Sequence, residues 1–368
     1  MKRTLWPVPL PEFVETMTAF FETPQPGANG WEVPGYSPPA WFAGGAAILG
    51  YICKGIQADL GRKVTLMLPA YFCGQSLRHV RSSGVRLLFY PVDKELNPDY
   101  QWIIAKLTTE EVDVFLHVHY FGLIVKQDQS KVICDNYNII MVEDCAHIAH
   151  PSVGGEWKGD YLFFSPHKYF PIGAGGVLYS SIGKVTFPQH AHVASSIVWF
   201  FVKLLRRWML LMKKPRKKIE WGIVWSSNVE ELPSSSAPRF VKNMTYSLSR
   251  DCQKLADCRL LNLQRLMGVL GRYQGWTPII DYSGKSGIPF TLGMRCETEP
   301  MARSRYLSLA EAGCPVFIWP DLPSELQSEF TEVEGVVSMV LETIFFAIHD
   351  QISIEEFVIR VERALGEQ

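Results

Sequence analysis

Three short apolar runs lie close together in the middle of the chain. They span residues 139–142, 161–164 and 177–179, and each is bounded by glycine, proline or an acidic residue. Uninterrupted apolar runs of this length are typical of strands buried on both faces of a mainly parallel sheet. The pattern therefore predicts three buried strands within residues 139–180.

Apolar runs also alternate with helical patterns nearer the start of the chain. Strand-like runs at residues 64–68, 85–93 and 112–122 are separated by loop and helix segments. Strands that alternate with helices are typical of a layered α/β domain. We therefore expect all six runs to belong to one large α/β domain.

A change of composition separates this region from the rest of the chain. Residues 230–238, EELPSSSAP, have the composition of a linker, and a long helical pattern runs from Phe240 to Leu270. Two further strand-like runs and a closing helix follow, at residues 290–296, 315–319 and 353–365. The predicted organisation is a large domain over residues 1–238 and a smaller α+β domain over residues 239–368.

A basic and apolar segment near residues 196–218 interrupts the α/β pattern. Its cations recur at helical spacing, at Lys203, Arg206, Arg207, Lys213 and Lys214. Aromatic and aliphatic residues fill the other positions, which predicts a basic amphipathic helix. A core helix with a solvated edge, a helix lying on anionic lipid and a partner-binding surface remain alternative interpretations.

Composition narrows the class of protein. The 368 residues are 47% hydrophobic and carry a net charge of -1, so the chain can bury a large core and offers no general case for nucleic-acid binding. Eight cysteines without a Cys-x-x-Cys pair predict reduced thiols, with neither a disulfide framework nor a zinc site. The first residues lack the apolar stretch of a signal peptide, and no uncharged apolar run is long enough to span a membrane, so we expect a cytoplasmic location.

Polar residues follow the central apolar runs where the strands should end. Asp144 closes the first run, Ser165 follows the second, and Lys168 comes three residues later. Ligands of open α/β sheets bind beyond the carboxyl ends of strands. A lysine there can form a Schiff base with the aldehyde of pyridoxal phosphate (PLP), and an acid can pair with its pyridinium nitrogen. Asp144 and Lys168 are therefore candidate catalytic residues of a PLP site.

Two glycines, Gly44 and Gly45, open the helical pattern that follows residue 45. Backbone amides at a glycine-rich helix start can approach an anion, and the helix dipole favours negative charge there. The pair is a candidate phosphate site, with ordinary close packing as the alternative.

Six separated segments resemble, in order, the motifs of the DegT/StrS family of PLP-dependent sugar aminotransferases. They are AGGAAI (43–48), LPAYFC (68–73), HVHYFG (117–122), VEDCAH (142–147), Lys168 followed by GAGG (173–176), and AIHDQISIEEF (347–357). The resemblance covers roughly residues 40–180 and 240–365. It implies a fold-type-I PLP-dependent transferase, with a large domain built on a mainly parallel sheet between helices.

The resemblance also implies roles for individual residues. Lys168 matches the lysine that binds the cofactor, and Asp144 matches the acid beside the pyridine nitrogen. His147 stands at the position that contacts the ring oxygen. Tyr71 is the candidate for stacking on the ring, with Phe72 as its alternative. Further implied contacts are the phosphate ligands Ser165, Gly44 and Gly45, and His167 as a neighbour.

The sequence departs from the family pattern at several positions. Ala174 stands where the family has glutamate, and Gly45 stands where it has threonine. The spacing from Asp160 to Lys168 is shorter than the family pattern. The spelling Ser-Pro-His-Lys that ends at Lys168 also resembles class V aminotransferases, another branch of the same fold type. These departures bear on which substrate and which reaction the protein has, more than on whether it binds PLP.

The function implied by the resemblance is amino transfer from an amino acid, such as glutamate, to a keto sugar carried on a nucleotide. The pathway would be polysaccharide or secondary-metabolite biosynthesis, and the enzyme would be a homodimer. One alternative is a PLP-dependent sugar dehydratase or lyase, although Lys168 favours transamination because the dehydratase branch of the family has histidine there. Another alternative is a degenerate, non-catalytic member that acts as a binding or scaffold subunit.

Overall fold

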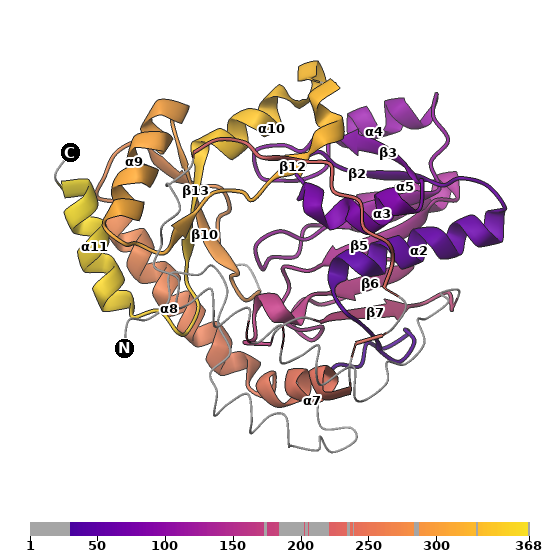
Figure 1. Ribbon diagram of the computed structural model, residues 1–368, viewed down its shortest axis with the longest axis horizontal. Coiled ribbons are helices and arrows are strands. Elements are labelled where there is room, and N and C mark those ends of the chain that lie inside the picture. Colours follow the sequence, from indigo (N-terminus) through magenta and orange to yellow (C-terminus); the bar gives the residue numbers. More distant parts are fainter. Residues whose placement is uncertain are drawn as a thin grey trace.

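The computed structural model describes residues 30–172, 175–183, 202, 205, 221–233, 236–237, 239–282, 287–328 and 330–366. Figure 1 shows two layered parts side by side, a larger one formed by the first half of the chain and a smaller one formed mostly by the last third. Each part is a sheet packed against helices, as expected for the predicted fold class.

The larger part is built on a seven-stranded sheet with the strand order β1-β7-β6-β5-β4-β2-β3. The strands are β1 (Ala40–Phe42), β2 (Thr65–Pro69), β3 (Arg86–Tyr90), β4 (Val114–Val118), β5 (Ile140–Cys145), β6 (Tyr161–Phe164) and β7 (Gly176–Ser180). The five strands from β3 to β6 are parallel, and β7 runs antiparallel between β6 and β1. The mainly parallel sheet that the apolar runs predicted is therefore confirmed.

Helices cover both faces of this sheet. They are α2 (Gly45–Leu60), α3 (Arg78–Ser82), α4 (Tyr100–Leu107) and α5 (Asp128–Tyr137), joined by the short 3-10 turns η1 (Gly74–Leu77) and η2 (Pro166–Lys168). Successive side chains of a strand point to opposite faces. Accordingly, Leu66 and Leu68 of β2 pack in the cluster that contains α2, while Met67 packs in the cluster that contains α4 and α5.

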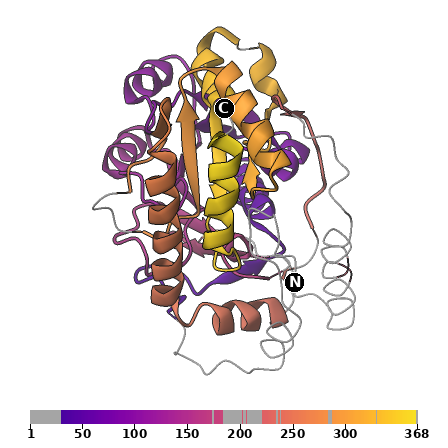
Figure 2. The same ribbon diagram turned by 90° about the vertical axis from the view of Figure 1, so that its left-hand side faces the viewer.

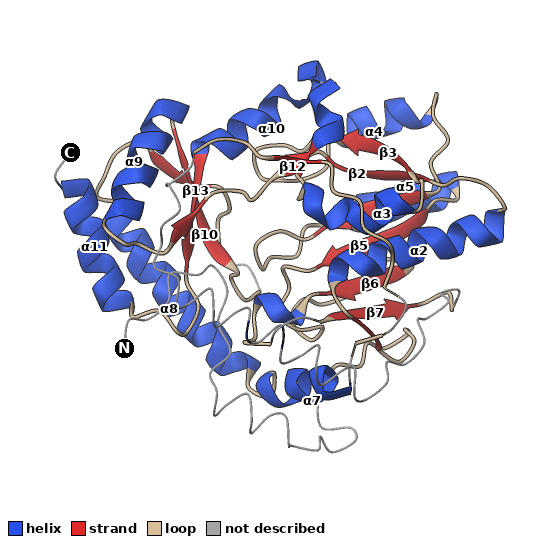
Figure 3. Ribbon diagram, viewed as in Figure 1, coloured by secondary structure: helices blue, strands red, loops and turns tan. Residues whose placement is uncertain are grey.

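The smaller part contains a four-stranded antiparallel sheet with the order β11-β13-β10-β9. Its strands are β9 (Trp276–Pro278), β10 (Thr291–Cys296), β11 (Val316–Phe317) and β13 (Thr343–Ala347). Figure 2 shows three helices side by side over its outer face, namely α8 (Cys252–Leu270), α9 (Glu299–Glu311) and α11 (Ile354–Gly366). The carboxyl ends of β5 and β6 are directed toward the smaller part (Figure 3).

Several elements connect the two parts. They are β8 (Trp225–Ser226), which pairs in parallel with β12 (Leu322–Pro323), together with η3 (Ser324–Ser328), α7 (Arg239–Leu248) and α10 (Phe330–Glu342). The helical pattern predicted from Phe240 to Leu270 is interrupted, because the Asp251 side chain accepts a hydrogen bond from the Lys254 amide and starts α8 anew.

The position of α7 bears on the expected domain boundary. Phe240, Val241 and Met244 of this helix pack in the core of the larger part, whereas Leu263 of α8 packs in the core of the smaller part. The division after residue 238 stays a prediction. The basic amphipathic helix predicted near residues 196–218 lies outside the described residues, apart from Val202 and Leu205, which are helical and exposed.

Candidate active site

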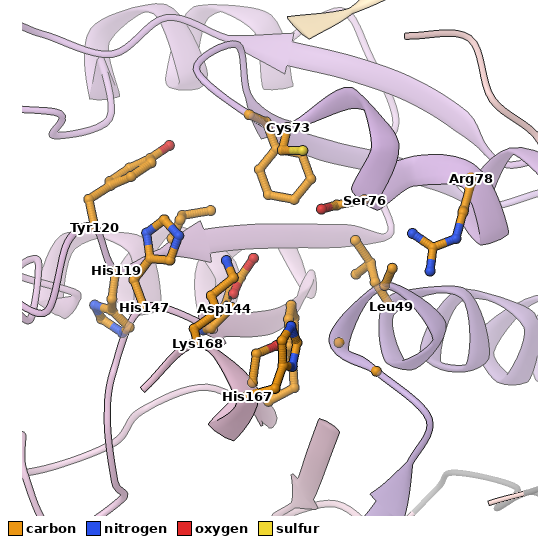
Figure 4. Close-up of a pocket in the computed structure, with 18 of the residues that line it drawn as sticks. Leu49, Cys73, Ser76, Arg78, His119, Tyr120, Asp144, His147, His167 and Lys168 are labelled. Atoms are coloured by element: carbon orange, nitrogen blue, oxygen red, sulfur yellow. Dashed lines mark hydrogen bonds between the residues drawn. The ribbon is translucent and has the colours of Figure 1, made fainter. Parts of the chain in front are cut away.

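A cavity of about 310 Å³ opens at the carboxyl ends of β5 and β6. Its lining includes six of the seven site residues predicted from the sequence, namely Gly44, Gly45, Asp144, His147, Ser165 and Lys168. Figure 4 shows Asp144, His147 and Lys168 directed toward the same space. The parallel strands bring these residues together because their carboxyl ends meet at one edge of the sheet.

An acid and a lysine face each other across this cavity. Asp144 lies near the end of β5 and is buried, and its Oδ1 accepts a hydrogen bond of 2.8 Å from the Ala146 amide. Burial raises the pKa of Asp144, and the positive charge of Lys168 opposes that rise. Burial lowers the pKa of Lys168, and the charge of Asp144 opposes that fall. Each group therefore stabilises the charged form of the other.

His147 is held between two aromatic rings. Its ring centroid lies 4.8 Å from that of Phe290 and 5.5 Å from that of Phe121, with both pairs stacked. The Phe121 amide donates a hydrogen bond of 3.4 Å to Nδ1 of His147. Burial, and then the charge of Lys168, hold the pKa of His147 well below its usual value. The imidazole is therefore neutral, with Nε2 as its donor.

The first turn of α2 meets the end of β6 at the cavity. A Cβ at Gly45 would lie 2.5 Å from Oγ of Ser165, and a Cβ at Gly176 would lie 2.7 Å from the carbonyl carbon of Gly44. Glycine at these positions thus lets a hydroxyl and a neighbouring strand approach the start of the helix. The helix has no side-chain cap, so its first amides face this space together with Ser165. His167 also lines the cavity, and its Nδ1 lies 3.1 Å from the carbonyl oxygen of Gly175.

Tyr71 and Phe72 have different surroundings. Tyr71 is fully buried, with its ring centroid 4.3 Å from that of Trp319, and it does not line the cavity. Its hydroxyl has no hydrogen-bond partner among the described residues. Phe72, the alternative, does line the cavity, as does Trp319. Of the two aromatic rings, the one that lines the cavity is therefore that of Phe72.

A buried pair next to Asp144, of which His119 lines the cavity, was not predicted from the sequence. His119 and Glu143 are fully buried, and Nε2 of His119 donates a hydrogen bond of 2.7 Å to Oε2 of Glu143. Nδ1 of His119 accepts a hydrogen bond from the Val125 amide, which fixes the tautomer. Glu143 also accepts hydrogen bonds from the amides of Lys158 and Gly159. Although burial acts to raise the pKa of Glu143, these partners lower it, chiefly His119.

Contacts between Tyr169 of the larger part and residues of the smaller part support the site. The Tyr169 hydroxyl lies 2.8 Å from the carbonyl oxygen of His147 and 2.7 Å from that of Ile288. The buried guanidinium of Arg259 lies 4.6 Å from the Tyr169 ring centroid and donates to the carbonyl oxygen of Phe290 at 2.9 Å. These contacts hold residues 288–290, which directly precede β10, against His147 and Lys168.

The wall of the cavity opposite Lys168 comes from α2, η1 and α3. Cys73, Ser76 and Arg78 line it, and none of them was a predicted site residue. The Cys73 thiol donates a hydrogen bond of 2.9 Å to Oδ1 of Asp321, and burial raises the pKa of Cys73 to about 11. The thiol is therefore protonated at neutral pH.

The described residues also bear on metal binding and membrane insertion. They contain no group of three or more side chains arranged to bind a metal ion. None of the helices in the same residues has both the length and the hydropathy needed to cross a membrane.

The sequence model of the DegT/DnrJ/EryC1/StrS aminotransferase family matches residues 54–183. This stretch contains the strands from β2 to β7 and both Asp144 and Lys168. Over these residues the chain is similar to this family. The resemblance seen in the sequence motifs is thereby confirmed over the part of the chain that carries Asp144 and Lys168.

Solved structures of similar fold extend the comparison to the whole chain. PseC of Helicobacter pylori, an aminotransferase involved in the biosynthesis of pseudoaminic acid, is 12% identical with a TM-score of 0.70, and all of both chains is covered. NtdA of Bacillus subtilis, with bound cofactor PMP, is 13% identical with a TM-score of 0.65 over 98% of this chain and 82% of that one. Spr1654 of Streptococcus pneumoniae in its PLP form is 14% identical with a TM-score of 0.63, over 97% of this chain and 98% of that one.

At these identities the likeness establishes the fold, and the predicted fold class is confirmed. The matching family model describes aminotransferases, and two of the similar structures hold PLP or PMP, which agrees with the predicted enzyme class and cofactor. The cavity fits this cofactor. It places a buried acid, a lysine and an uncapped helix start with a hydroxyl around one space, and a side chain at Gly45 would collide with that hydroxyl.

Proposed function

We propose that this protein is a PLP-dependent aminotransferase that acts on a keto sugar, with an amino acid as the amino donor. One observation carries the proposal: Asp144 and Lys168 reach the same cavity from the ends of neighbouring strand segments, and each affects the pKa of the other. The family match over residues 54–183 and the sugar pathway named for PseC support the same reaction class.

PLP, when bound, supplies an aldehyde for amines and a ring that withdraws electrons from the substrate carbon. Lys168 is the amine that would hold the aldehyde. Its lowered pKa raises the fraction of unprotonated amine, which is the form that attacks a carbonyl and accepts a proton from the substrate carbon. Asp144 would keep the ring nitrogen protonated by pairing with it.

The other lining residues would position the cofactor. The first amides of α2 at Gly44 and Gly45, with the Ser165 hydroxyl, are the proposed phosphate site. We favour Phe72 over Tyr71 for contact with the ring, because Phe72 lines the cavity. Neutral His147 can donate from Nε2 to the ring oxygen.

The finer assignments are part of the same proposal. We propose that the keto sugar is linked to a nucleotide and that the product enters polysaccharide or secondary-metabolite biosynthesis. The proposed assembly is a homodimer in the cytoplasm. Contact with a membrane through residues 196–218 stays a prediction, since most of that segment lies outside the described residues.

Product analysis tests the reaction. PLP-loaded protein is incubated with L-glutamate and a panel of nucleotide-linked keto sugars, and the products are separated by mass spectrometry. A new sugar amine together with 2-oxoglutarate, both lost in Lys168→Ala, is the expected result. Loss of water from the sugar without a new amine would favour the dehydratase alternative. Bound PLP with no turnover of any donor and acceptor would favour the non-catalytic subunit.

A further inference from the structure

An arginine lines the cavity on the wall to which no cofactor contact is assigned. Arg78 is the first residue of α3, and it lines the cavity together with Ser76 of η1. Figure 4 shows both side chains across the space from Lys168, with the Ser76 hydroxyl directed into it. The proposed cofactor contacts leave these two residues without a role.

The charged side chains of the described lining are few. They are Asp144, Lys168 and Arg78. If Asp144 pairs with the ring nitrogen and Lys168 carries the aldehyde, Arg78 is the charge that remains for an incoming substrate. A fixed positive charge at the open side of a cavity attracts anions and aligns them.

Two contacts hold the guanidinium at this position. Nη1 donates a hydrogen bond of 3.1 Å to the carbonyl oxygen of Gln75, and Nε lies 2.6 Å from Oε2 of Glu230. The Arg78 side chain is 34% exposed and that of Glu230 is 62% exposed. An ion pair exposed to this degree contributes little free energy, so an anionic ligand can compete for the guanidinium.

We propose that Arg78 binds the anionic group of a substrate, through charge-assisted hydrogen bonds to carboxylate or phosphate oxygens. The planar guanidinium matches both groups. The anion is the carboxylate of the amino donor or a phosphate of the nucleotide carrier, since both share this chemistry. The inference rests on the proposed function, because it takes the cavity to be the site of amino transfer. Glu230 holds Arg78 in place and competes with the anion.

Calorimetric titration of the PLP-loaded protein tests this assignment. Uridine diphosphate probes the phosphate group, and glutarate probes the carboxylate of a donor such as glutamate. Loss of a hydrogen-bonded charge is worth about 1.5–3 kcal/mol, so Arg78→Gln should weaken binding of one probe or both by at least about tenfold. The probe that is affected identifies the source of the anion. Glu230→Gln should bind that probe as tightly as the wild type or more tightly.

Arg86→Gln is the matched control. Arg86 lies on β3 outside the cavity, is 52% exposed and forms a similar ion pair with Glu110, so its loss changes the net charge by the same amount. It should leave both affinities unchanged. Equal affinities in Arg78→Gln and wild type, or no binding of either probe by wild type, would overturn the inference.

The visible absorption of bound PLP separates this inference from the proposed function. Arg78→Gln should take up PLP as the wild type does, which also establishes that the variant is folded. PLP uptake with no effect at Arg78 would contradict the anion site alone. Failure of the wild type to take up PLP would contradict the proposed function itself.

Discussion

The two walls of the cavity differ in how firmly their polar side chains are held. On the wall at the strand ends, Asp144 is buried and His147 lies between two stacked rings. On the opposite wall, Arg78 is held mainly by Glu230, whose side chain is exposed. Groups that stabilise charge on a cofactor act best when they are preorganised and shielded from water. A group that exchanges ligands in each turnover must instead stay accessible. The wall at the strand ends meets the first requirement, and the wall with Arg78 meets the second.

The largest effect is expected on the buried wall. Asp144→Asn keeps the shape of the side chain but removes its charge, so the ring nitrogen loses its partner. Amino transfer should fall by roughly a hundredfold to a thousandfold, as for loss of one preorganised electrostatic group. The measurement is the rate of 2-oxoglutarate formation from glutamate. Asp128→Asn, at a position where the side chain is 72% exposed, is the control and should retain full activity.

A smaller effect is expected from the residues that brace this wall. Tyr169→Phe removes the hydroxyl that lies between the carbonyl oxygens of His147 and Ile288. We expect a fall of about tenfold in kcat with PLP uptake retained, in line with the loss of one or two buried hydrogen bonds. Tyr179→Phe, which removes a buried hydroxyl that donates to the carbonyl oxygen of Trp31 outside the cavity lining, should leave kcat unchanged. Equal kcat values in the two variants would contradict a positioning role for Tyr169.

The buried wall should also respond to pH. His117 lies behind it with its ring centroid 5.1 Å from that of His119, and burial lowers the pKa of His117 to about 3. Because the unfolded chain binds a proton near pH 6.5 and the folded protein does not, the free energy of unfolding should fall below that pH, by up to about 1.4 kcal/mol per pH unit for this residue. Denaturant unfolding of wild type and His117→Gln between pH 7 and 5 measures the difference. Equal slopes in the two proteins would exclude His117 as the cause.

The smallest expected effects are those of substituting the two aromatic residues after β2, and they show which of the two contacts the cofactor ring. The buried Tyr71 hydroxyl has no hydrogen-bond partner among the described residues, so Tyr71→Phe should leave PLP affinity and stability near the wild-type values. Phe72→Ala should weaken PLP binding, because Phe72 lines the cavity. Titration with PLP measures both, and the reverse order would return the ring contact to Tyr71.

The sequence could predict the sheet that carries the site, because uninterrupted apolar runs leave few alternatives to buried strands. β5, β6 and β7 lie where the runs at 139–142, 161–164 and 177–179 were expected to form strands. It could not locate β13, since Thr343–Ala347 directly follows α10 without a turn signal. The sequence did not predict the break between α7 and α8 either, because a polar residue such as Asp251 also fits an exposed position of one continuous helix.

The candidate site was predictable where its residues lie at strand ends. Asp144, Ser165 and Lys168 could be placed together for that reason. Trp319, Phe290 and Arg259 come from remote segments, and only the packing of the smaller part brings them near His147. His119 could have been predicted as a site residue, since it lies inside the HVHYFG motif. Its pairing with Glu143 could not, because that pairing depends on the parallel register of β4 and β5. The choice between Tyr71 and Phe72 required the direction of each side chain.

Borohydride reduction of bound PLP is a direct test of whether Lys168 holds PLP opposite Asp144. The visible absorption spectrum of the purified protein with added PLP is recorded before and after borohydride reduction, beside that of Lys168→Ala. If Lys168 holds PLP in this way, the wild type has an absorption band of bound PLP that borohydride removes and that the variant lacks. No such band in either protein would contradict it and would leave the non-catalytic subunit as the better description.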